Sequence, residues 1–299
     1  MKILILGYGD NGGATWFVSQ AINRYTDHVA RGVRMVQNYL DYPHDILEPG
    51  AQRLRNLWAW ADVVHVRDSA FFMPDGLPHK PTVVTYTGKS YRRNFVKHHR
   101  QCKERHWLAT CSTIDMRAYY PADPPIWLPN PREDMLDRAD PDPGRFVAVH
   151  APTMRERKGT ATIIKAVAGL EGVELELIEQ TTYAECLRRK AAGHVVVDQF
   201  RMGYGNNAVE GWALGLPAIG GVMAEKFGRP LLEHAGYLPY VKASETVESI
   251  SHWLARLRDD PDFYRQARER GRAYFFQYHH APVVAQKAVA LYEQARDMI

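Results

Sequence analysis

The stretch Val197–Gly221, VDQFRMGYGNNAVEGWALGLPAIGG, begins at the end of an apolar run, passes through a turn rich in glycine and asparagine, and enters a short helical pattern. The helix is predicted to stop at Gly215, because Pro217 follows shortly after it, and a small apolar strand comes next. A strand, a turn, a helix and a strand in this order are typical of a parallel sheet covered by helices. Asn207, as N-cap, and Glu210 at the helix start have a spacing close to that of a capping box.

The same alternation of short apolar runs and helical patterns extends over the whole chain. The runs predicted to form strands are KILILG, GVRMV, ADVVHV, TVVTYT, WLATCS and IWLPN in the first half, and RFVAVHA, VELELIE, HVVVDQ and LPAIGG in the second. Helical spacing is found in ATWFVSQAINRY, GAQRLRNLWAWA, TATIIKAVAGL and SETVESISHWLARL, among others. Continuous apolar strands that alternate with helices indicate parallel sheets covered on both faces. The predicted fold class is therefore α/β, with two doubly wound sheets.

A chain of 299 residues is long for one core and sufficient for two domains of roughly 150 residues. The charged segment Pro131–Arg145, rich in Asp and Pro, has no apolar periodicity and is predicted to be a linker. We therefore expect one domain over residues 1–135, a second over 136–275, and a terminal segment over 276–299 with one apolar helical stripe. Ligands bind at the carboxyl ends of parallel strands, so a shared site is expected in a cleft between the domains.

The composition is that of a folded protein with a mild basic bias: 45% of the residues are apolar, and the formal net charge is +4. This bias permits an anionic partner without requiring one. The cysteines Cys102, Cys111 and Cys186 show neither a disulfide framework nor the spacing of metal ligands. The first apolar run is too short for a signal peptide or a membrane span. The sequence therefore predicts a soluble cytoplasmic protein without a metal site.

A glycine-rich loop, GYGDNGGATWF, follows the first predicted strand and leads into a helix. Glycines at such a point let the backbone approach a ligand closely, and a helix start offers amides to an anion. The spacing differs from the dinucleotide-binding fingerprint, because the third glycine does not fall at the required offset. Two interpretations remain open: a binding loop around Gly12 and Gly13, or a tight turn without a ligand.

A second loop, within HAPTMRERKGTATIIKA (His150–Ala166), also joins a strand to a helix and carries Arg155, Arg157 and Lys158. Cations beside a glycine and a helix start, at the carboxyl end of a strand, suit a diphosphate. The alternative is a solvated basic loop. By the same positional argument, Glu210 near the end of another strand could accept both hydroxyls of a ribose, or serve only to cap its helix.

The segment TGKSYRRNFVKHHRQCKERH (Thr87–His106) holds three lysines, four arginines and three histidines in twenty residues. Like-charge runs are usually solvated faces, but this one concentrates positive charge in the first domain directly after a strand end. An anionic partner, either a membrane surface or nucleic acid, would be attracted to it. The residues predicted to make this contact are Lys89, Arg92, Arg93, Lys97, Arg100, Lys103 and Arg105.

The motifs HAPTMRERKGTATIIKAV and AVEGWALGLPAIGG resemble those of GT-B glycosyltransferases of family 4, which transfer sugars from nucleotide-sugar donors with retention of anomeric configuration. The resemblance covers nearly the whole chain, with NGGAT, WADVVHVRD, PTVVTYTG, ATCS, LPNP and RKGT in the family's order. It implies two Rossmann-like domains facing a cleft, with a terminal helix that crosses back onto the first domain. The implied donor is a UDP- or GDP-sugar, and the implied reaction requires no metal.

The resemblance also implies roles for individual residues. Arg155 and Lys158 would hold the donor diphosphate, and Asn207 would present helix amides to it, so these three are the predicted catalytic residues. Glu210 matches the family's second glutamate, which contacts the nucleotide ribose. The other residues predicted to bind the donor are Gly12, Gly13, His150, Thr153, Asp198, Gln199, Tyr204, Asn206 and Ala208.

Two positions depart from the family pattern. Met202 stands where the first glutamate would contact the transferred sugar, and Thr87 replaces the histidine of a YHG-like turn. The predicted function is retaining, metal-independent transfer of a hexosyl or other glycosyl group to a hydroxyl of a glycan or lipid-linked glycan, in the cytoplasm or peripherally at the inner membrane face. Two alternatives are transfer to hydroxymethylated bases of viral DNA, and a catalytically degenerate protein that binds nucleotide sugars.

Overall fold

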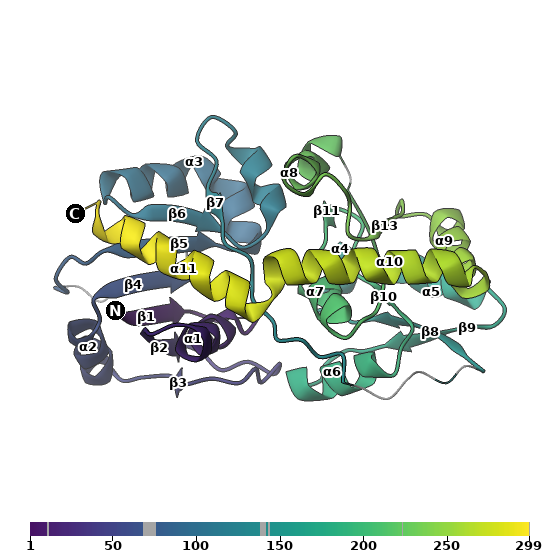
Figure 1. Cartoon of the computed structure of the whole chain (residues 1–299), viewed down its shortest axis with the longest axis horizontal. Helices are drawn as coiled ribbons and strands as arrows, with labels where there is room; N and C mark the ends of the chain where they lie inside the picture. The colour runs from purple at the N-terminus through teal and green to yellow at the C-terminus, as the bar shows by residue number, and fades with distance from the viewer. Residues whose placement is uncertain (11, 68–75, 138–141, 143, 223, 299) are drawn as a thin grey trace. The chain divides into compact units, whose positions relative to one another are not determined.

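The computed structural model describes every residue except 11, 68–75, 138–141, 143, 223 and 299. The side chain of Lys89 also lies outside the description. The described residues form two compact units, Met1–Pro131 with His279–Ile299, and Arg132–Tyr278. Each unit contains a mainly parallel sheet with helices on its faces (Figure 1). The predicted α/β class with two doubly wound sheets is therefore confirmed. The part of the predicted linker at 138–141 and 143 lies outside the described residues.

The first unit is built on a sheet of seven strands in the order β3-β2-β1-β4-β5-β6-β7, all of them parallel. Its strands are β1 (Lys2–Gly7), β2 (Val29–Arg34), β3 (Ile46–Leu47), β4 (Val63–Arg67), β5 (Thr82–Tyr86), β6 (Leu108–Cys111) and β7 (Ile126–Trp127). Its helices are α1 (Ala14–Tyr25), α2 (Ala51–Trp60), α3 (Gly88–Glu104), the 3-10 helix η1 (Ile114–Tyr119) and α11 (Ala281–Arg296).

Strand β1 is central in this sheet, and its apolar residues are buried on both faces. Ile3 and Ile5 belong to a core cluster with the inner residues of α1 and α11, so the terminal helix packs on the first sheet. Leu4 and Leu6 point to the opposite face because side chains alternate along a strand, and they are equally buried. This double burial explains why the strand reads as a continuous apolar run in the sequence.

The second unit contains the sheet order β9-β8-β10-β12-β13, with β11 antiparallel to β12 at one end. Its strands are β8 (Phe146–His150), β9 (Val173–Leu177), β10 (Val195–Val197), β11 (Met202–Gly203), β12 (Ala218–Val222) and β13 (Val241–Lys242). Its helices are α4 (Arg155–Lys158), α5 (Thr160–Ala168), α6 (Tyr183–Ala191), α7 (Asn206–Ala213), α8 (Glu225–Ala235), α9 (Val247–Asp259) and α10 (Pro261–Tyr274), and the π-helix η2 (Phe275–His279) leads on to α11.

Helix α7 lies close to strand β10, and two glycines allow this. A Cβ on Gly211 would lie 2.7 Å from Val196 Cγ2, so a side chain there would push the helix away from the sheet. The helix ends at Ala213, and Gly215 follows with a φ of +75°, a conformation that favours glycine. The helix stop predicted at Gly215 is confirmed. The close approach fixes the start of α7 beside the carboxyl end of β10.

Local patterns predicted the strands better than the helices. The α1 helix has the predicted bounds, and each of the ten predicted runs overlaps a strand. The short strands β3, β11 and β13 were not predicted, because two residues cannot show a period. Helices α3, α6, α8 and α10 were not assigned either, and α6 carries a residue of the site described next.

Candidate functional site

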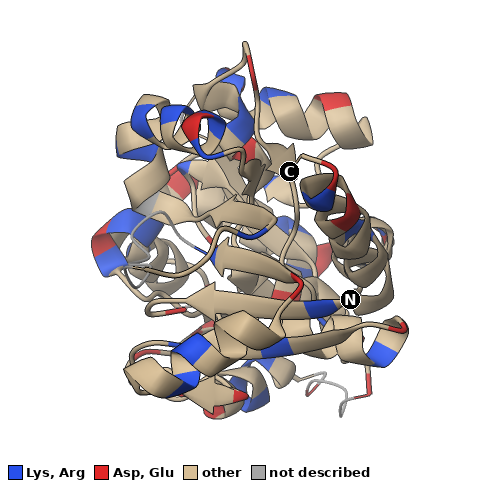
Figure 2. Ribbon diagram, turned by 90° about the vertical axis from the view of Figure 1, so that its left-hand side faces the viewer, with Lys and Arg blue, Asp and Glu red and all other residues tan. Residues whose placement is uncertain are grey.

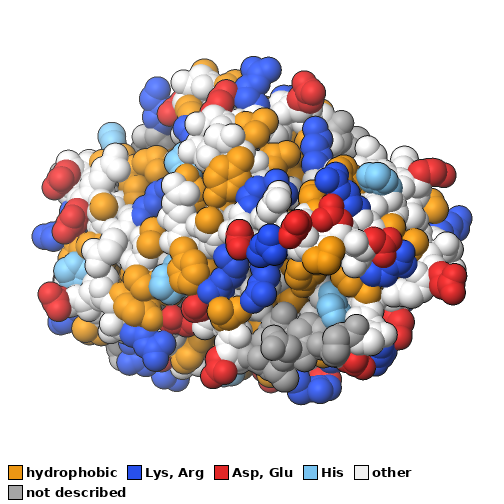
Figure 3. Space-filling view, turned by 45° about the vertical axis from the view of Figure 1, so that its right-hand side comes forward, with side chains coloured by type: hydrophobic (Ala, Val, Ile, Leu, Met, Phe, Trp, Pro, Cys, Tyr) orange, Lys and Arg blue, Asp and Glu red, His pale blue; other side chains and the backbone are white. Residues whose placement is uncertain are grey.

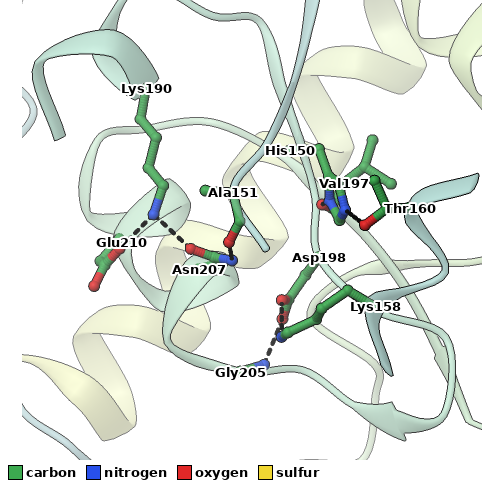
Figure 4. Close-up of polar contacts among 10 residues, drawn as sticks. All are labelled: His150, Ala151, Lys158, Thr160, Lys190, Val197, Asp198, Gly205, Asn207 and Glu210. Carbon is green, nitrogen blue, oxygen red and sulfur yellow. Dashed lines mark hydrogen bonds and ion pairs between the residues drawn. The ribbon is translucent and has the colours of Figure 1, made fainter. Parts of the chain in front are cut away.

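The candidate site lies in the second unit, at the carboxyl ends of β8 and β10. The chain leaves β8 for β9 on one side and later crosses to β10 on the other, so the strand order reverses between β8 and β10. Crevices at such reversals are the usual ligand sites of open α/β sheets. His150 ends β8, Asp198 follows β10, and Lys158 ends α4, the short helix after β8. Figure 4 shows these residues together with the start of α7.

Lys158 and Asp198 form an ion pair that the sequence did not predict, although both residues were predicted to bind the donor. Lys158 Nζ lies 2.9 Å from Asp198 Oδ1, and the amide of Gly205 donates to the other carboxylate oxygen. The Asp198 side chain is 1% exposed, whereas that of Lys158 is 16% exposed. Lys158 therefore has a fixed position and still reaches the surface, which suits a cation that must meet a ligand.

The Gly205 turn passes very close to this ion pair. A Cβ on Gly205 would lie 3.4 Å from both Lys158 Nζ and Asp198 Oδ2. Gly205 is also the N-cap of α7, and as a glycine it has no side chain that could bond the first amides of that helix. The leading amides of a helix have no acceptor within the helix, and the helix dipole favours an anion beside them. The arrangement places a cation and a helix start at the same point.

His150 is an internal residue, and its role in donor binding stays a prediction. The side chain is 0% exposed. Its Nδ1 lies 2.7 Å from the carbonyl oxygen of Val197, which can only accept, so Nδ1 carries the proton. Its Nε2 then accepts from the Thr160 hydroxyl at 2.8 Å. His150 thus joins β8 to β10 and α5, and both ring nitrogens are engaged.

Burial lowers the pKa of His150 to about 4, with the backbone bond to Val197 opposing the shift. Because the folded pKa lies below the ordinary value of 6.5, this histidine contributes full stability above pH 6.5 and loses it as the pH falls toward 4. The contribution is roughly 3 kcal/mol. We expect His150→Asn to weaken the fall in unfolding free energy between pH 7 and pH 4.5, measured by urea denaturation at each pH.

His252 offers a matched control for that experiment, because it is exposed on α9. His252→Asn is expected to leave the pH dependence unchanged. His65, buried in the first unit with a pKa that burial lowers well below 6.5, retains part of the dependence in both variants. An equal pH dependence in His150→Asn and the wild type would contradict the neutral, buried state of His150.

Glu210 and Asn207 form neither the predicted capping box nor an open ribose site. Helix α7 begins at Asn206 with Gly205 as its N-cap, so Asn207 lies one residue inside the helix. Glu210 is 2% exposed, and Lys190 and Arg132 donate to its two oxygens. In this structure Glu210 is an internal counter-ion, and the ribose contact predicted for it stays a prediction.

Lys190 and Arg132 are the residues that sequence reasoning missed. The side chains of both are 1% exposed. Lys190 lies near the end of α6, in the basic run Arg188–Lys190 that resembles an ordinary solvated helix end. Arg132 lies within the segment predicted to be a linker. Neither position carries a local signal, although a lysine or arginine so deeply buried is rare unless it is paired.

Three other residues were predicted to bind the donor: Arg155, Thr153 and Tyr204. Arg155 forms a bidentate ion pair with Glu179, and its side chain is 59% exposed. Thr153 is exposed on the loop before α4. Tyr204 is buried, and its hydroxyl lies 2.7 Å from that of Tyr274. The predicted contact of Tyr204 with the donor is therefore corrected, while the roles of Arg155 and Thr153 stay predictions.

The remaining predicted residues of this unit surround the start of α7. Asn206 is half-buried, and Ala208 is buried in the first turn. Gln199 is buried after β10, where its carbonyl accepts from the amide of Gly221. Met202 begins the short strand β11 and pairs with Val222. The structure thus brings these residues to one end of the sheet, and their contacts with a donor stay predictions.

In the first unit, the start of α1 is already capped by a carboxylate. Asp10 accepts from the amides of Ala14 and Thr15 at 2.9 and 3.0 Å, and from the Thr15 hydroxyl. The expectation that this helix offers free amides to an anion is therefore wrong, because Asp10 occupies them. Gly13 is the N-cap with a φ of +63°, and a Cβ there would collide with Tyr42. The contact of Gly12 and Gly13 with a donor stays a prediction.

Helix α3 contains most of the basic segment and presents part of it to solvent. Arg92 is an exception, which corrects its predicted role: its guanidinium lies 2.9 Å from Asp115, and both side chains are largely buried. His98 and His99 are buried as well. The side chain of Lys89 lies outside the described residues. The exposed cations, which we call the α3 basic face, are Arg93, Lys97, Arg100, Lys103 and Arg105.

The α3 basic face differs from the other basic regions in its ion pairing. Within the described part of the chain, none of its five cations lies within ion-pair distance of a carboxylate, whereas Arg92 on the same helix does. Figure 2 shows Lys and Arg in blue, and they are frequent on the helices at the top of that view. On the face drawn in Figure 3, basic side chains lie beside acidic ones. The α3 basic face is therefore available to an anionic partner.

The described residues contain neither a candidate membrane span nor a candidate metal site. No helix there is long and apolar enough to cross a membrane. No group of three or more His, Cys, Asp or Glu residues within the same ranges is placed to hold a metal ion.

Comparison with known proteins identifies the fold. No protein-family model and no curated protein matches the chain. Solved structures similar to it include HepE (Alr3699) from Anabaena in complex with UDP-glucose, with a TM-score of 0.67 and 12% identity, covering 98% of this chain and 100% of that one. A glycosyltransferase from Rickettsia africae has a TM-score of 0.68 and 10% identity, with 98% of each chain covered.

A third similar structure is an α-glucosyltransferase in complex with UDP and a 13-mer DNA containing an HMU base. Its TM-score is 0.67 at 13% identity, and 98% of this chain and 99% of that chain are covered. At such identities the similarity shows the fold. The protein has the GT-B fold of two Rossmann-like domains.

Proposed function

We propose that the protein is a glycosyltransferase that moves a hexosyl or other glycosyl group from a UDP- or GDP-sugar to a hydroxyl acceptor, with retention of configuration and without a metal. The observation that carries this proposal is the meeting of Lys158 with the start of α7 at the strand-order reversal. A diphosphate suits that point because it carries negative charge on oxygens that both groups can bind. The fold shared with structures that hold UDP or UDP-glucose supports the same donor class.

In this mechanism the bond between the sugar's anomeric carbon and the diphosphate breaks, and the acceptor oxygen bonds to the same face of that carbon. The departing diphosphate gains negative charge, which Lys158 and the first turn of α7 stabilise from fixed positions. Asp198 orients Lys158 through the 2.9 Å ion pair. The acceptor's proton passes to an oxygen of the departing phosphate, so no protein base is required.

The most informative experiment is a panel of nucleotide sugars tested for binding and turnover. Thermal shift with UDP- and GDP-sugars is expected to identify the donor, and release of the nucleoside diphosphate in EDTA is expected to show turnover without a metal. NMR of the product's anomeric proton tests retention. If donors bind without any turnover, the degenerate binding protein replaces the enzyme. If none of them binds, the proposal fails.

The acceptor is proposed to be anionic or attached to an anionic surface, because the α3 basic face lacks carboxylate partners within the described residues. A lipid-linked glycan meets this condition, and it would place the enzyme in the cytoplasm, peripheral to the inner membrane face. Modified DNA is the second candidate, which the DNA-containing α-glucosyltransferase structure supports. Both candidates use the same cations, so binding experiments must separate them.

We expect the variant Arg93→Glu/Lys97→Glu/Arg100→Glu to lose binding to its anionic partner, because three cations become three anions. For DNA, measured by fluorescence anisotropy against salt, the slope of log K on log salt is expected to fall by about 3. For the lipid-linked acceptor, co-sedimentation with vesicles containing phosphatidylserine is expected to be lost instead. Donor hydrolysis is expected to stay unchanged in this variant. Unaltered binding to both partners would contradict a role for the α3 basic face.

A further inference from the structure

Lys190 is buried and charged, and the mechanism above gives it no role. Its side chain is 1% exposed at the end of α6. Nζ donates to Asn207 Oδ1 at 2.6 Å and also to Glu210. Burial opposes its charge, but the attractions of Glu210, Cys186 and Asp198 together outweigh burial and raise the pKa of Lys190. One ammonium thus binds two side chains that lie a single turn apart on α7 (Figure 4).

Asn207 extends this contact to the sheet. Its Nδ2 donates to the carbonyl of Ala151 at 2.6 Å, directly after β8. The first turn of α7 is therefore bound to α6 through Lys190 and to the end of β8 through Asn207. This is the turn that faces the predicted diphosphate position beside Lys158. Small displacements of such a turn would weaken every contact that its amides make with an anion.

Glu210 has a second cationic partner, so Lys190 is not needed merely to neutralise it. Arg132 lies 3.1 Å from the other oxygen of the carboxylate, and its side chain is 1% exposed. Burial opposes the charge of Glu210, but the two cations together lower the pKa of this carboxyl. Arg132 and Lys190 thus carry the same charge and bind the same carboxylate. Their other contacts differ: Lys190 also bonds Asn207, whereas Arg132 lies over the Tyr183 ring.

We infer that Lys190 is a positioning residue of the donor site, which holds the first turn of α7 through Asn207 and adds buried positive charge next to it. The inference rests on the proposed function, because it concerns the diphosphate of the same donor. Lys190 would act on the charged part of the donor and leave the binding of the nucleoside unaffected. That selectivity separates positioning from a general contribution to folding.

The test compares Lys190→Met with Arg132→Met by calorimetric titration of UDP, GDP, uridine and guanosine. Each variant removes one cation and leaves Glu210 paired with the other, so both are expected to fold, as thermal melting will show. Lys190→Met is expected to weaken nucleoside diphosphate binding about tenfold and nucleoside binding less than twofold. Arg132→Met is expected to change both affinities by less than threefold.

Asn207→Ala provides a second variant if Lys190→Met does not fold, because it keeps the Lys190–Glu210 ion pair and removes the bonds of Asn207 to Lys190 and to the Ala151 carbonyl. It is expected to show the same selective loss. The inference would be overturned if Lys190→Met and Arg132→Met lost equal affinity for the nucleoside diphosphate. It would also be overturned if Lys190→Met lost equal affinity for nucleoside and nucleoside diphosphate. In both cases, binding of the nucleoside diphosphate by the wild type would still support the proposed function. A wild-type protein that binds neither UDP nor GDP would overturn both.

Discussion

Lys158→Ala is expected to lower donor turnover by about 10²–10³-fold, which is the usual cost of removing one group that stabilises charge developing in a transition state. Lys158 is the cation with a fixed position and partial exposure at the end of α4. Its removal leaves the buried Asp198 carboxylate without this cation, although the Gly205 amide still donates to it, so some stability is lost as well. The double variant Lys158→Ala/Asp198→Asn removes that unpaired charge and isolates the catalytic effect. Initial rates of nucleoside diphosphate release measure it.

Lys165→Ala is the matched control, since Lys165 is exposed on the neighbouring helix α5. It makes the same change in net charge and is expected to keep wild-type turnover. Melting temperatures of all three variants show whether lost activity follows lost folding. Near-normal turnover in Lys158→Ala would rule out Lys158 as the residue that stabilises the leaving group.

Glu210→Ala is expected to destabilise the second unit by about 3–5 kcal/mol, because it leaves Lys190 and Arg132 buried without their shared carboxylate. In thermal melting this corresponds to a fall on the order of 10 °C. A glutamate that served only a ribose would behave differently. Its loss would weaken nucleoside binding and leave the melting temperature nearly unchanged.

The control for Glu210 is Glu185→Ala on the adjacent helix α6. Glu185 pairs with Arg188 at the surface, three residues away. Exposed pairs contribute about 1 kcal/mol or less, so this variant is expected to melt close to the wild type. A Glu210→Ala protein as stable as Glu185→Ala, with weakened binding of uridine or guanosine, would support the ribose interpretation.

The sequence predicted those parts of the fold that depend on neighbouring residues. Strand β1 and helix α1 were predicted because burial on both faces of a sheet, or on one side of a helix, produces a regular period. The helix stop at Gly215 was predicted because glycine tolerates a positive φ. Lys158 was placed in the site by its position in the loop after a strand, and Asp198 by the family resemblance.

Other parts of the site depend on residues that are distant in the sequence. Glu210 meets Arg132 across 78 positions and Lys190 across 20, and no spacing rule connects them. Arg92 belongs to a basic run but turns inward to Asp115, 23 positions away. The apolar contacts and the Tyr274 hydroxyl that bury Tyr204 come from another helix. In each case the side chain contacts a residue that is distant in the sequence, so the local pattern could not predict the contact.

The opening stretch Val197–Gly221 shows this division clearly. By itself the sequence determined a strand, a glycine turn, a helix and a strand, because backbone conformation and one-sided burial are local properties. Tertiary structure alone decided what Asn207 and Glu210 do. Their partners, Ala151, Lys190 and Arg132, come from other elements. A buried carboxylate takes its role from the charges that surround it, and folding brings those charges together.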